Sequence, residues 1–424
     1  MSFPPLKIVV VGGGAAGFFG AIACSTPHTN VTILEAGRQT LAKVRISGGG
    51  RCNVTHACFD PGIFVQNYPR GGKALRGAFT QFQARDTVEW FTARGVQLKT
   101  EADGRMFPTT NDSATIVECL TRVALDRGVS IRTGAAVVSV TRKSTVGDNH
   151  LFEIRLKSGE IVECDRLLLA TGSSPLGYRW AKALGHQVAA PVPSLFTFKI
   201  SDPRFQGLAG ISVENVCLQL PTAKLKQIGP VLVTHWGLSG PAVLKLSAWG
   251  ARFLHENDYQ ADLLINWLSH LNPEDIRTQL LGLKSQEKKA IVNSCPFSLP
   301  RRLWEGLIIA ADIDPQKRWG ELSKKAINKL ILELTQGKYQ VQGKGVFKEE
   351  FVTCGGVSLK EINFKTMESR CCQGLYFAGE ILDIDGVTGG FNFQSAWTTG
   401  WLAGQGMKVR GVAHTDYGTD TRIP

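Results

Sequence analysis

In the first third of the chain, the pattern of apolar and polar positions predicts buried strands that alternate with helices carrying apolar residues on one side. Lys7-Ile-Val-Val-Val11 is an uninterrupted apolar run, typical of a parallel strand covered on both faces. A helix over 15–25 and a second apolar strand over 31–35 follow it. The same patterning predicts a long helix over 72–94, a hairpin over 97–108 that turns at Asp103-Gly104, a helix that starts near Ser113 and stops at Gly128, and a third parallel strand over 129–133.

The middle of the chain changes character near Pro191 and Pro193. Before them, three short strands lead into a buried strand that ends in Ala170-Thr171-Gly172. After them, short alternating segments predict a small β-domain, and the chain from Pro273 becomes helical. The predicted elements are strands over 136–142, 151–157, 160–164, 165–170, 195–200, 213–220 and 230–234, helices over 274–283, from near Glu287 and over 322–334, and a buried strand over 374–378.

A glycine turn joins the first strand to the first helix in the pattern Gly-x-Gly-x-x-Gly. Its first glycine permits a tight turn, the second lets the backbone approach a pyrophosphate, and the third lets helix and strand pack closely. An acidic residue follows the first glycine by about 20 positions, at a strand end, where it can accept ribose hydroxyls. The unit predicts a dinucleotide site, open between NAD and FAD, although its N-terminal position favours FAD. The residues concerned are Gly12, Gly14, Ala15, Ala16, Gly17, Glu35 and Ala36.

A second glycine-rich stretch lies between Lys43 and Thr55. Three consecutive glycines give a bare loop whose amides can approach a flat ligand, and Lys43 and Arg51 add positive charge that suits a pyrophosphate. The residues predicted to contact the cofactor are Lys43, Ser47, Gly48, Gly49, Gly50, Arg51, Cys52 and Asn53.

With this stretch the sequence resembles the BaiN-like bacterial NAD(P)/FAD-dependent oxidoreductases, also called aminoacetone-oxidase-like flavoproteins. The match at 46–55 is nearly residue for residue. Further matches at 234–242, 352–357, 366–369 and 374–394 follow in the family's order. The resemblance implies an α/β fold with a Rossmann-like FAD-binding domain of the glutathione-reductase type. This domain would comprise 1–192 and 345–424, interrupted by a β-barrel-like substrate domain (193–272) and a helical part (273–344).

The resemblance also implies further contacts with FAD. Adenine would lie against the main chain of Ala136 and Val137, and a strand end would turn beneath the dinucleotide at Ala170, Thr171 and Gly172. A Gly-Glu pair would bind the ribityl chain, and the start of the last helix would face the flavin N1/C2 edge. The residues of these last two elements are Gly379, Glu380, Asp383, Gly389, Gly390, Phe391, Asn392 and Gln394. Most family members carry Tyr where this chain has Phe391.

Two residues are weighed as catalytic. His235, in the run Thr234 to Pro241, titrates near neutrality and could donate a proton, or could simply be a hydrogen-bonded loop histidine. Cys52 follows a glycine loop as redox cysteines do, but five residues separate it from Cys58, where the redox disulfide of glutathione-reductase-like enzymes has four. A dithiol needs closely matched sulfurs, which disfavours a disulfide here.

Composition narrows the class of protein. The 424 residues suggest two or three domains, and 43% hydrophobic residues is ordinary for a globular enzyme. Ten scattered cysteines form neither a disulfide framework nor a zinc motif, so we expect no metal and a reducing, cytoplasmic compartment. Because the first predicted strand begins by Leu6, we expect no signal peptide, and we find no uninterrupted apolar run of about 20 residues that predicts a membrane span.

The formal net charge of +12 is spread along the chain without a specific nucleic-acid motif. The function expected is FAD-dependent hydride transfer through flavin N5 to an activated double bond or carbonyl of a small molecule. The resemblance implies NAD(P)H as a transient electron donor, and the sequence has no second glycine-turn unit that would hold it. A flavin-dependent RNA-modifying enzyme and a non-catalytic flavin redox sensor remain alternatives, and the oligomeric state is left open.

Overall fold

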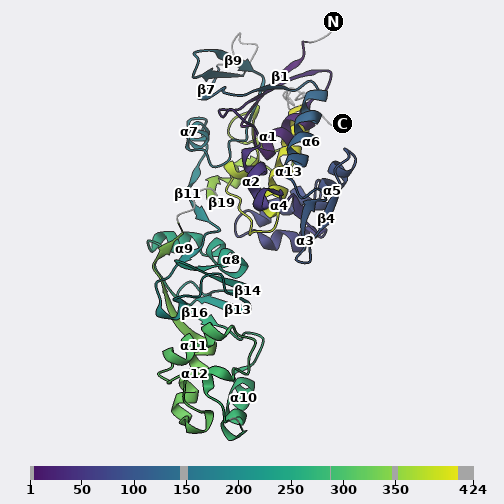
Figure 1. Cartoon of the computed structure of the whole chain (residues 1–424). Helices are drawn as coiled ribbons and strands as arrows, with labels where there is room; N and C mark the ends of the chain where they lie inside the picture. The colour runs from purple at the N-terminus through teal and green to yellow at the C-terminus, as the bar shows by residue number, and fades with distance from the viewer. Residues whose placement is uncertain (1–3, 144–150, 287, 346–351, 409–424) are drawn as a thin grey trace, which may run out of the picture.

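The computed structural model describes residues 4–143, 151–286, 288–345 and 352–408. They form two lobes, one above the other in Figure 1, with the N-terminal strand and the last helix both in the upper lobe. Two antiparallel strands, β11 (Val188–Ser194) and β19 (Val352–Val357), run between the lobes. The predicted boundary at 192/193 falls within β11, and the boundaries of the domains stay a prediction.

A seven-stranded sheet is the centre of the upper lobe. Its order is β20-β21-β22-β10-β1-β2-β6, and the strands from β22 to β6 are parallel. This confirms the buried strands predicted from the apolar runs, with Val10 paired to both Leu168 and Ile33. The bounds are β20 Ile362–Asn363, β21 Glu368–Ser369, β22 Leu375–Phe377, β10 Arg166–Leu169, β1 Leu6–Val11, β2 Thr29–Leu34 and β6 Ser130–Arg132.

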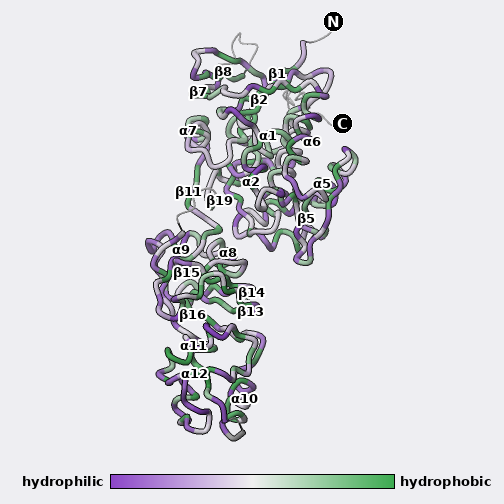
Figure 2. The backbone as a smooth tube through the Cα atoms, viewed as in Figure 1, coloured by the Kyte–Doolittle hydropathy of each residue, from purple (hydrophilic) through white to green (hydrophobic). Residues whose placement is uncertain are grey.

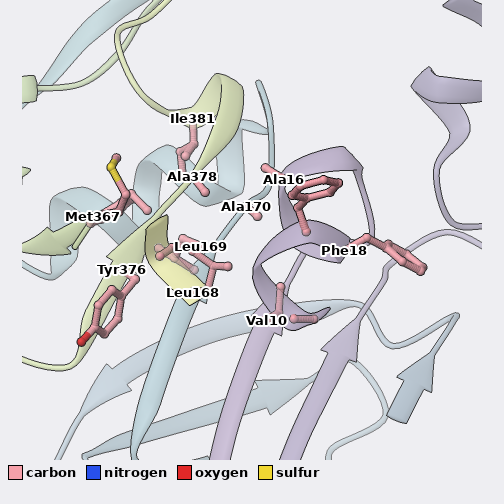
Figure 3. Close-up of a cluster of buried hydrophobic side chains, with 14 of the residues drawn as sticks. Val10, Ala16, Phe18, Leu168, Leu169, Ala170, Met367, Tyr376, Ala378 and Ile381 are labelled. Carbon is pink, nitrogen blue, oxygen red and sulfur yellow. The ribbon is translucent and has the colours of Figure 1, made fainter. Parts of the chain in front are cut away.

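Two helices pack tightly against each other beside this sheet. They are α1 (Ala15–Cys24) and α13 (Phe391–Lys408). A Cβ on Gly404 would lie 2.4 Å from the Ala23 Cβ, so the two helix backbones meet where no larger residue fits. Figure 3 shows the buried side chains at the start of α1, with Ala16 beside Ala170, which follows β10.

The rest of the upper lobe surrounds this core. The predicted hairpin and three-stranded meander are confirmed, and a short strand, β3, adds to the hairpin. The remaining elements are α2 (Ala42–Gly50), β3 (Thr55–His56), α3 (Pro61–Phe64), α4 (Gly72–Phe79), α5 (Ala84–Thr92), β4 (Leu98–Thr100), β5 (Arg105–Pro108), α6 (Ala114–Asp126), β7 (Val137–Arg142), β8 (Phe152–Leu156), β9 (Ile161–Cys164) and α7 (Pro175–Ala183), with a 3₁₀ turn at Val65–Asn67 and others at Leu359–Glu361 and Gly379–Ile381.

The single helix predicted over 72–94 is wrong, because the chain forms two helices, α4 and α5, with a break between them. The Gln83 amide donates to the Asp86 carboxylate (2.7 Å), which begins α5 afresh. The Phe82 carbonyl accepts from Thr398 Oγ1 of α13 (2.9 Å). Capping and a tertiary hydrogen bond therefore stop the helix where apolar spacing alone continues it.

The β-part of the lower lobe is a sheet whose two ends belong to one continuous segment. The order is β17-β16-β13-β14-β15-β12-β18, and β17 and β18 are successive halves of 337–344, so the sheet closes on itself as a barrel. Helices α8 and α9 belong to this part (Figure 1). The bounds are β12 Phe198–Lys199, β13 Ser212–Leu220, β14 Leu225–Thr234, β15 Gly237–Ser239, α8 Pro241–Trp249, α9 Ala251–Glu256, β16 Ala261–Asn266, β17 Gly337–Val341 and β18 Gly343–Lys344, with a 3₁₀ turn at Pro203–Phe205.

Three helices form the far end of the lower lobe: α10 (Pro273–Gln286), α11 (Arg301–Ala310) and α12 (Lys324–Gln336). Figure 2 shows apolar stretches on β13 and β14 and many hydrophilic ones on these helices. Glu287 lies outside the described residues. The helix predicted from there is wrong for 288–300, where only a 3₁₀ turn (Ile291–Asn293) forms before Pro300 precedes α11. Trp319–Glu321 is another 3₁₀ turn. None of the helices described is long and apolar enough to cross a membrane.

Candidate functional site

A cavity of about 810 Å³ opens in the upper lobe where the parallel strands β1, β2 and β10 end. The helices α1 and α13 begin at its wall, so their free amides and positive dipole ends border it. Most predicted cofactor residues line this cavity. They are Gly12, Gly14, Ala15, Ala16, Glu35, Lys43, Ser47, Gly48, Gly49, Asn53, Ala170, Thr171, Gly172, Gly379, Glu380, Gly389, Gly390 and Asn392.

The three glycines of the first turn have different surroundings. A Cβ on Gly12, where φ is +111°, would lie 2.3 Å from the Ala170 carbonyl oxygen, and one on Gly17 would lie 2.0 Å from the Gly12 carbonyl oxygen. A Cβ on Gly14 would meet nothing within 4 Å. The outer two glycines are therefore required by the fold itself, whereas Gly14 presents bare backbone to open space in the cavity.

The second glycine loop breaks the helix in which it lies. Within α2, Ser47 is extended and Gly48 and Gly49 have φ values of 58° and 69°. A Cβ on Gly49 would again meet nothing within 4 Å. Two separate turns thus expose backbone to one cavity, which fits a ligand with a pyrophosphate and a flat ring and supports FAD as the group held here.

Glu35 ends β2 at the cavity wall. Its Oε2 accepts from the Gly13 amide (2.8 Å) and its Oε1 accepts from the Gly37 amide (2.7 Å). Both oxygens are therefore held in place, at the position where the pattern predicts a ribose contact. The neighbouring Ala36 is exposed and does not line the cavity.

An ion pair crosses the cavity rim. Lys43 Nζ lies 2.6 Å from Glu380 Oε2, and Glu380 Oε1 accepts from the Thr353 amide (3.0 Å) of β19. Glu380 therefore links the cofactor loop to one of the two strands that connect the lobes. The Thr171 hydroxyl, also in the wall, is buried without a hydrogen-bond partner among the described residues, as a group that awaits a ligand or water would be.

Three residues of the second glycine loop do not line the cavity: Gly50, Arg51 and Cys52. Arg51 lies over the Phe107 ring (4.0 Å) and forms an ion pair with Glu101 (2.6 Å). Cys52 is fully buried, and burial raises the pKa of its thiol to about 12, so the thiol is neutral at physiological pH. Both Cys52 and Cys58 are free thiols.

Other predicted residues also lie outside the lining. Gln394 points into the protein, where its Oε1 accepts from Thr55 Oγ1 (2.7 Å), and Phe391 is buried. His235 is exposed at the tip of the β14–β15 hairpin. The full set outside the lining is Gly17, Ala36, Gly50, Arg51, Cys52, Ala136, Val137, His235, Asp383, Phe391 and Gln394.

Several lining residues were missed by sequence reasoning. Arg105 comes from the β4–β5 hairpin, and Leu195 and Val352 come from the chain segments that connect the lobes. No local motif marks Arg105 or Leu195, because tertiary packing alone brings them to the flavin loop. Val352 begins the 352–357 match, to which no contact with the cofactor was assigned. Gly13, by contrast, lies within the glycine motif and could have been included.

A buried ion pair lies where the loop over 383–390 meets β11, one of the two strands that connect the lobes. Arg70 pairs with both oxygens of the fully buried Asp385, and Ser194 Oγ donates to Asp385 Oδ2 (2.8 Å). Burial raises the pKa of Asp385, while the guanidinium and the hydroxyl oppose that shift. Asp385 therefore links the 383–390 loop to Arg70 and, through Ser194, to the end of β11.

One group of three potential metal ligands occurs in the described part of the chain: His186, Glu361 and Cys371, whose ligand atoms lie within 4.8 Å of one another. Ser369 Oγ accepts from the amides of Cys371 (3.0 Å) and Cys372 (2.8 Å), so its hydroxyl proton is left for His186 Nε2 (2.8 Å). His186 Nδ1 then carries a proton toward Glu361 (3.0 Å). Both nitrogens of the His186 ring therefore form hydrogen bonds within the fold.

Known proteins are similar to this chain over nearly its whole described length. The model of the "HI0933-like protein Rossmann domain" family matches residues 6–406. The "Ribosomal RNA dihydrouridine synthase" of Escherichia coli (strain K12) is 30% identical over 412 residues, which cover 94% of this chain and 97% of that protein. A protein with the same name from Haemophilus influenzae (strain ATCC 51907 / DSM 11121 / KW20 / Rd) is also 30% identical, over 93% of this chain and 96% of its own length.

A relative with a different name matches a similar share of this chain. The "3-dehydro-bile acid delta(4,6)-reductase" of Clostridium scindens (strain ATCC 35704 / DSM 5676 / VPI 13733 / 19) is 28% identical over 95% of this chain and 99% of that protein. Among solved structures, the 3-ketosteroid-delta4-(5alpha)-dehydrogenase of Rhodococcus jostii RHA1 has a TM-score of 0.51 at 16% identity, covering 97% of this chain and 98% of that chain. At this identity the likeness concerns the fold.

Proposed function

Because the chain belongs to the HI0933-like Rossmann family of flavin-dependent oxidoreductases, we propose that it is an FAD-dependent reductase of carbon–carbon double bonds conjugated to a carbonyl. The observation that carries the proposal is the cavity of about 810 Å³ into which two glycine turns present bare backbone at Gly14 and Gly49. Bound FAD would supply the two electrons, delivered as hydride from N5. The names of the relatives support the reaction type, since a dihydrouridine synthase and a delta(4,6)-reductase both add hydrogen across a double bond.

The chain's own residues would bind and orient the cofactor. The Gly13 and Gly14 turn and the first amides of α1 would hold the pyrophosphate, and Glu35 would exchange its backbone partners for ribose hydroxyls. Lys43 and Glu380 would meet the ribityl side, and the N-terminus of α13 would stabilise negative charge on the flavin ring. NAD(P)H would reduce the flavin by transient docking.

Our first candidate for the substrate is a uracil base in ribosomal RNA. The net charge of +12 and the 13 Lys and Arg against 8 Asp and Glu within residues 273–344 suit a polyanion, and two relatives carry the corresponding name. Lys324 and Lys325 are exposed at the start of α12 in this region. The second candidate is a small conjugated ketone, which the bile acid reductase relative supports.

The first experiment is an absorption spectrum of the purified protein, followed by anaerobic addition of NADPH or NADH. Yellow protein that bleaches supports the proposal. Protein that stays colourless after reconstitution with FAD contradicts it, and yellow protein that ignores both nucleotides contradicts the electron donor.

The substrate is tested by reoxidation of the reduced protein with unmodified ribosomal RNA or with a 4-en-3-one steroid. Dihydrouridine detected by mass spectrometry supports the RNA. A Lys324→Gln/Lys325→Gln variant should then bind RNA more weakly and with a smaller salt dependence, and should reduce any steroid at the wild-type rate. Steroid turnover without dihydrouridine would contradict the RNA assignment.

A further inference from the structure

His56 lies directly behind the glycine turn that begins α13. Its Nδ1 is 3.0 Å from the Gly389 carbonyl oxygen, and its ring stacks on Phe391 at 4.7 Å between centroids with 26° between planes. Gly389 and Gly390 line the cavity on the other side, whereas His56 does not. The imidazole is thus separated from the cavity only by the turn.

Hydrogen bonding defines which nitrogen is free to gain a proton. A carbonyl oxygen only accepts, so Nδ1 carries the hydrogen that binds Gly389. Nε2 faces the β4–β5 hairpin, where a Cβ on Gly104 would lie 2.5 Å from it. The ring is therefore fixed between the turn, the hairpin and Phe391, and any added proton goes to Nε2.

Three charged side chains act electrostatically on this ring. Asp103 and Arg105 come from the hairpin, and Lys245 comes from α8 of the lower lobe. Burial is the main cause that lowers the pKa of His56, and Lys245 and Arg105 lower it further, while the Gly389 hydrogen bond and Asp103 raise it. The folded chain favours the neutral ring near neutral pH. Its stability falls as the pH drops from the ordinary histidine pKa toward the lowered pKa of His56. New negative charge across the turn would favour protonation.

Resting on the proposed function, that FAD occupies this cavity, we propose that His56 is a positioning residue that fixes the Gly389 turn against the flavin and takes up a proton on Nε2 when the flavin is reduced. In the balance, a two-electron reductant provides two electrons. One proton goes with them to give the anionic reduced flavin, and a second goes to His56, so the net charge of the pair is unchanged. His56 thereby stabilises the reduced cofactor over the range in which histidine titrates.

The test measures the midpoint potential of the FAD-loaded protein as a function of pH, with dithionite as reductant. Wild type should take up about two protons per two electrons within part of the range from about pH 5 to 8, and about one outside it. His56→Asn keeps a donor for Gly389 without a titratable charge and should take up about one throughout. His28→Asn, at an exposed histidine outside the cavity lining, is the matched control and should behave as wild type.

A direct readout is the NMR titration of the His56 Cε1 proton in wild-type protein, whose midpoint should rise on reduction. This measurement needs no variant and decides the case if His56→Asn fails to fold. An unchanged midpoint, or equal proton uptake in wild type and His56→Asn, overturns the inference while leaving the proposed function intact. Wild-type protein that cannot be reconstituted with FAD overturns both.

Discussion

Replacement of Gly14 by alanine separates the cofactor role of the first turn from its structural role. Gly14 has φ −91° and ψ −172°, an extended conformation open to any residue, and the added Cβ meets nothing within 4 Å. Gly14 is also the N-cap of α1, where alanine is less favourable than glycine, so the free energy of unfolding of the apoprotein should fall by at most about 1 kcal/mol. The methyl group would occupy the space of the pyrophosphate. Loss of one backbone hydrogen bond to a charged group costs about 1.5–3 kcal/mol, so FAD should bind roughly 10- to 100-fold more weakly.

Gly17→Ala is the contrasting variant, since its Cβ would lie 2.0 Å from the Gly12 carbonyl oxygen. It should destabilise the apoprotein by about 1–3 kcal/mol or more. Gly77→Ala is the control for FAD affinity: its Cβ also meets nothing within 4 Å, but Gly77 lies inside α4, outside the cavity lining. It should raise the free energy of unfolding by about 0.5–1 kcal/mol and leave FAD affinity unchanged. The assays are urea unfolding of apoprotein and titration with FAD followed by fluorescence. Wild-type FAD affinity in Gly14→Ala would refute the placement of the pyrophosphate at this turn.

Two further predictions concern buried groups. Arg70→Met leaves the Asp385 carboxylate buried and unpaired, and should lower the free energy of unfolding in urea by about 3–5 kcal/mol. Arg70→Met/Asp385→Leu should lower it by less than Arg70→Met alone. A double variant whose loss equals the sum of the losses of the two single variants would contradict this account. Native protein treated with iodoacetamide near neutral pH should be alkylated at the exposed Cys371 and not at Cys52, because burial raises the pKa of Cys52 to about 12. Peptide mass spectrometry identifies the alkylated cysteines. Alkylation of Cys52 before unfolding would contradict this reasoning.

Local sequence determined the elements whose signals are local. The apolar run before Gly12 predicts a buried parallel strand whatever the rest of the chain does, and β1 forms there. The glycine spacing likewise predicts a turn with backbone open to a ligand, and Gly14 has that open space. A resemblance carried by ordered motifs predicted the family and the fold class, which are confirmed.

Tertiary structure alone decided which side chains face the cavity. Arg51 follows three glycines in sequence, two of which line the cavity, yet it turns away because Phe107 and Glu101 of a distant hairpin bind it. The same hairpin sends Arg105 to the cavity wall without any motif to announce it. His56 acquires its place behind the last helix only because Gly389, far along the chain, folds back onto it. Periodicity and turn chemistry act over a few residues, whereas the direction of a side chain depends on partners that the fold brings from elsewhere.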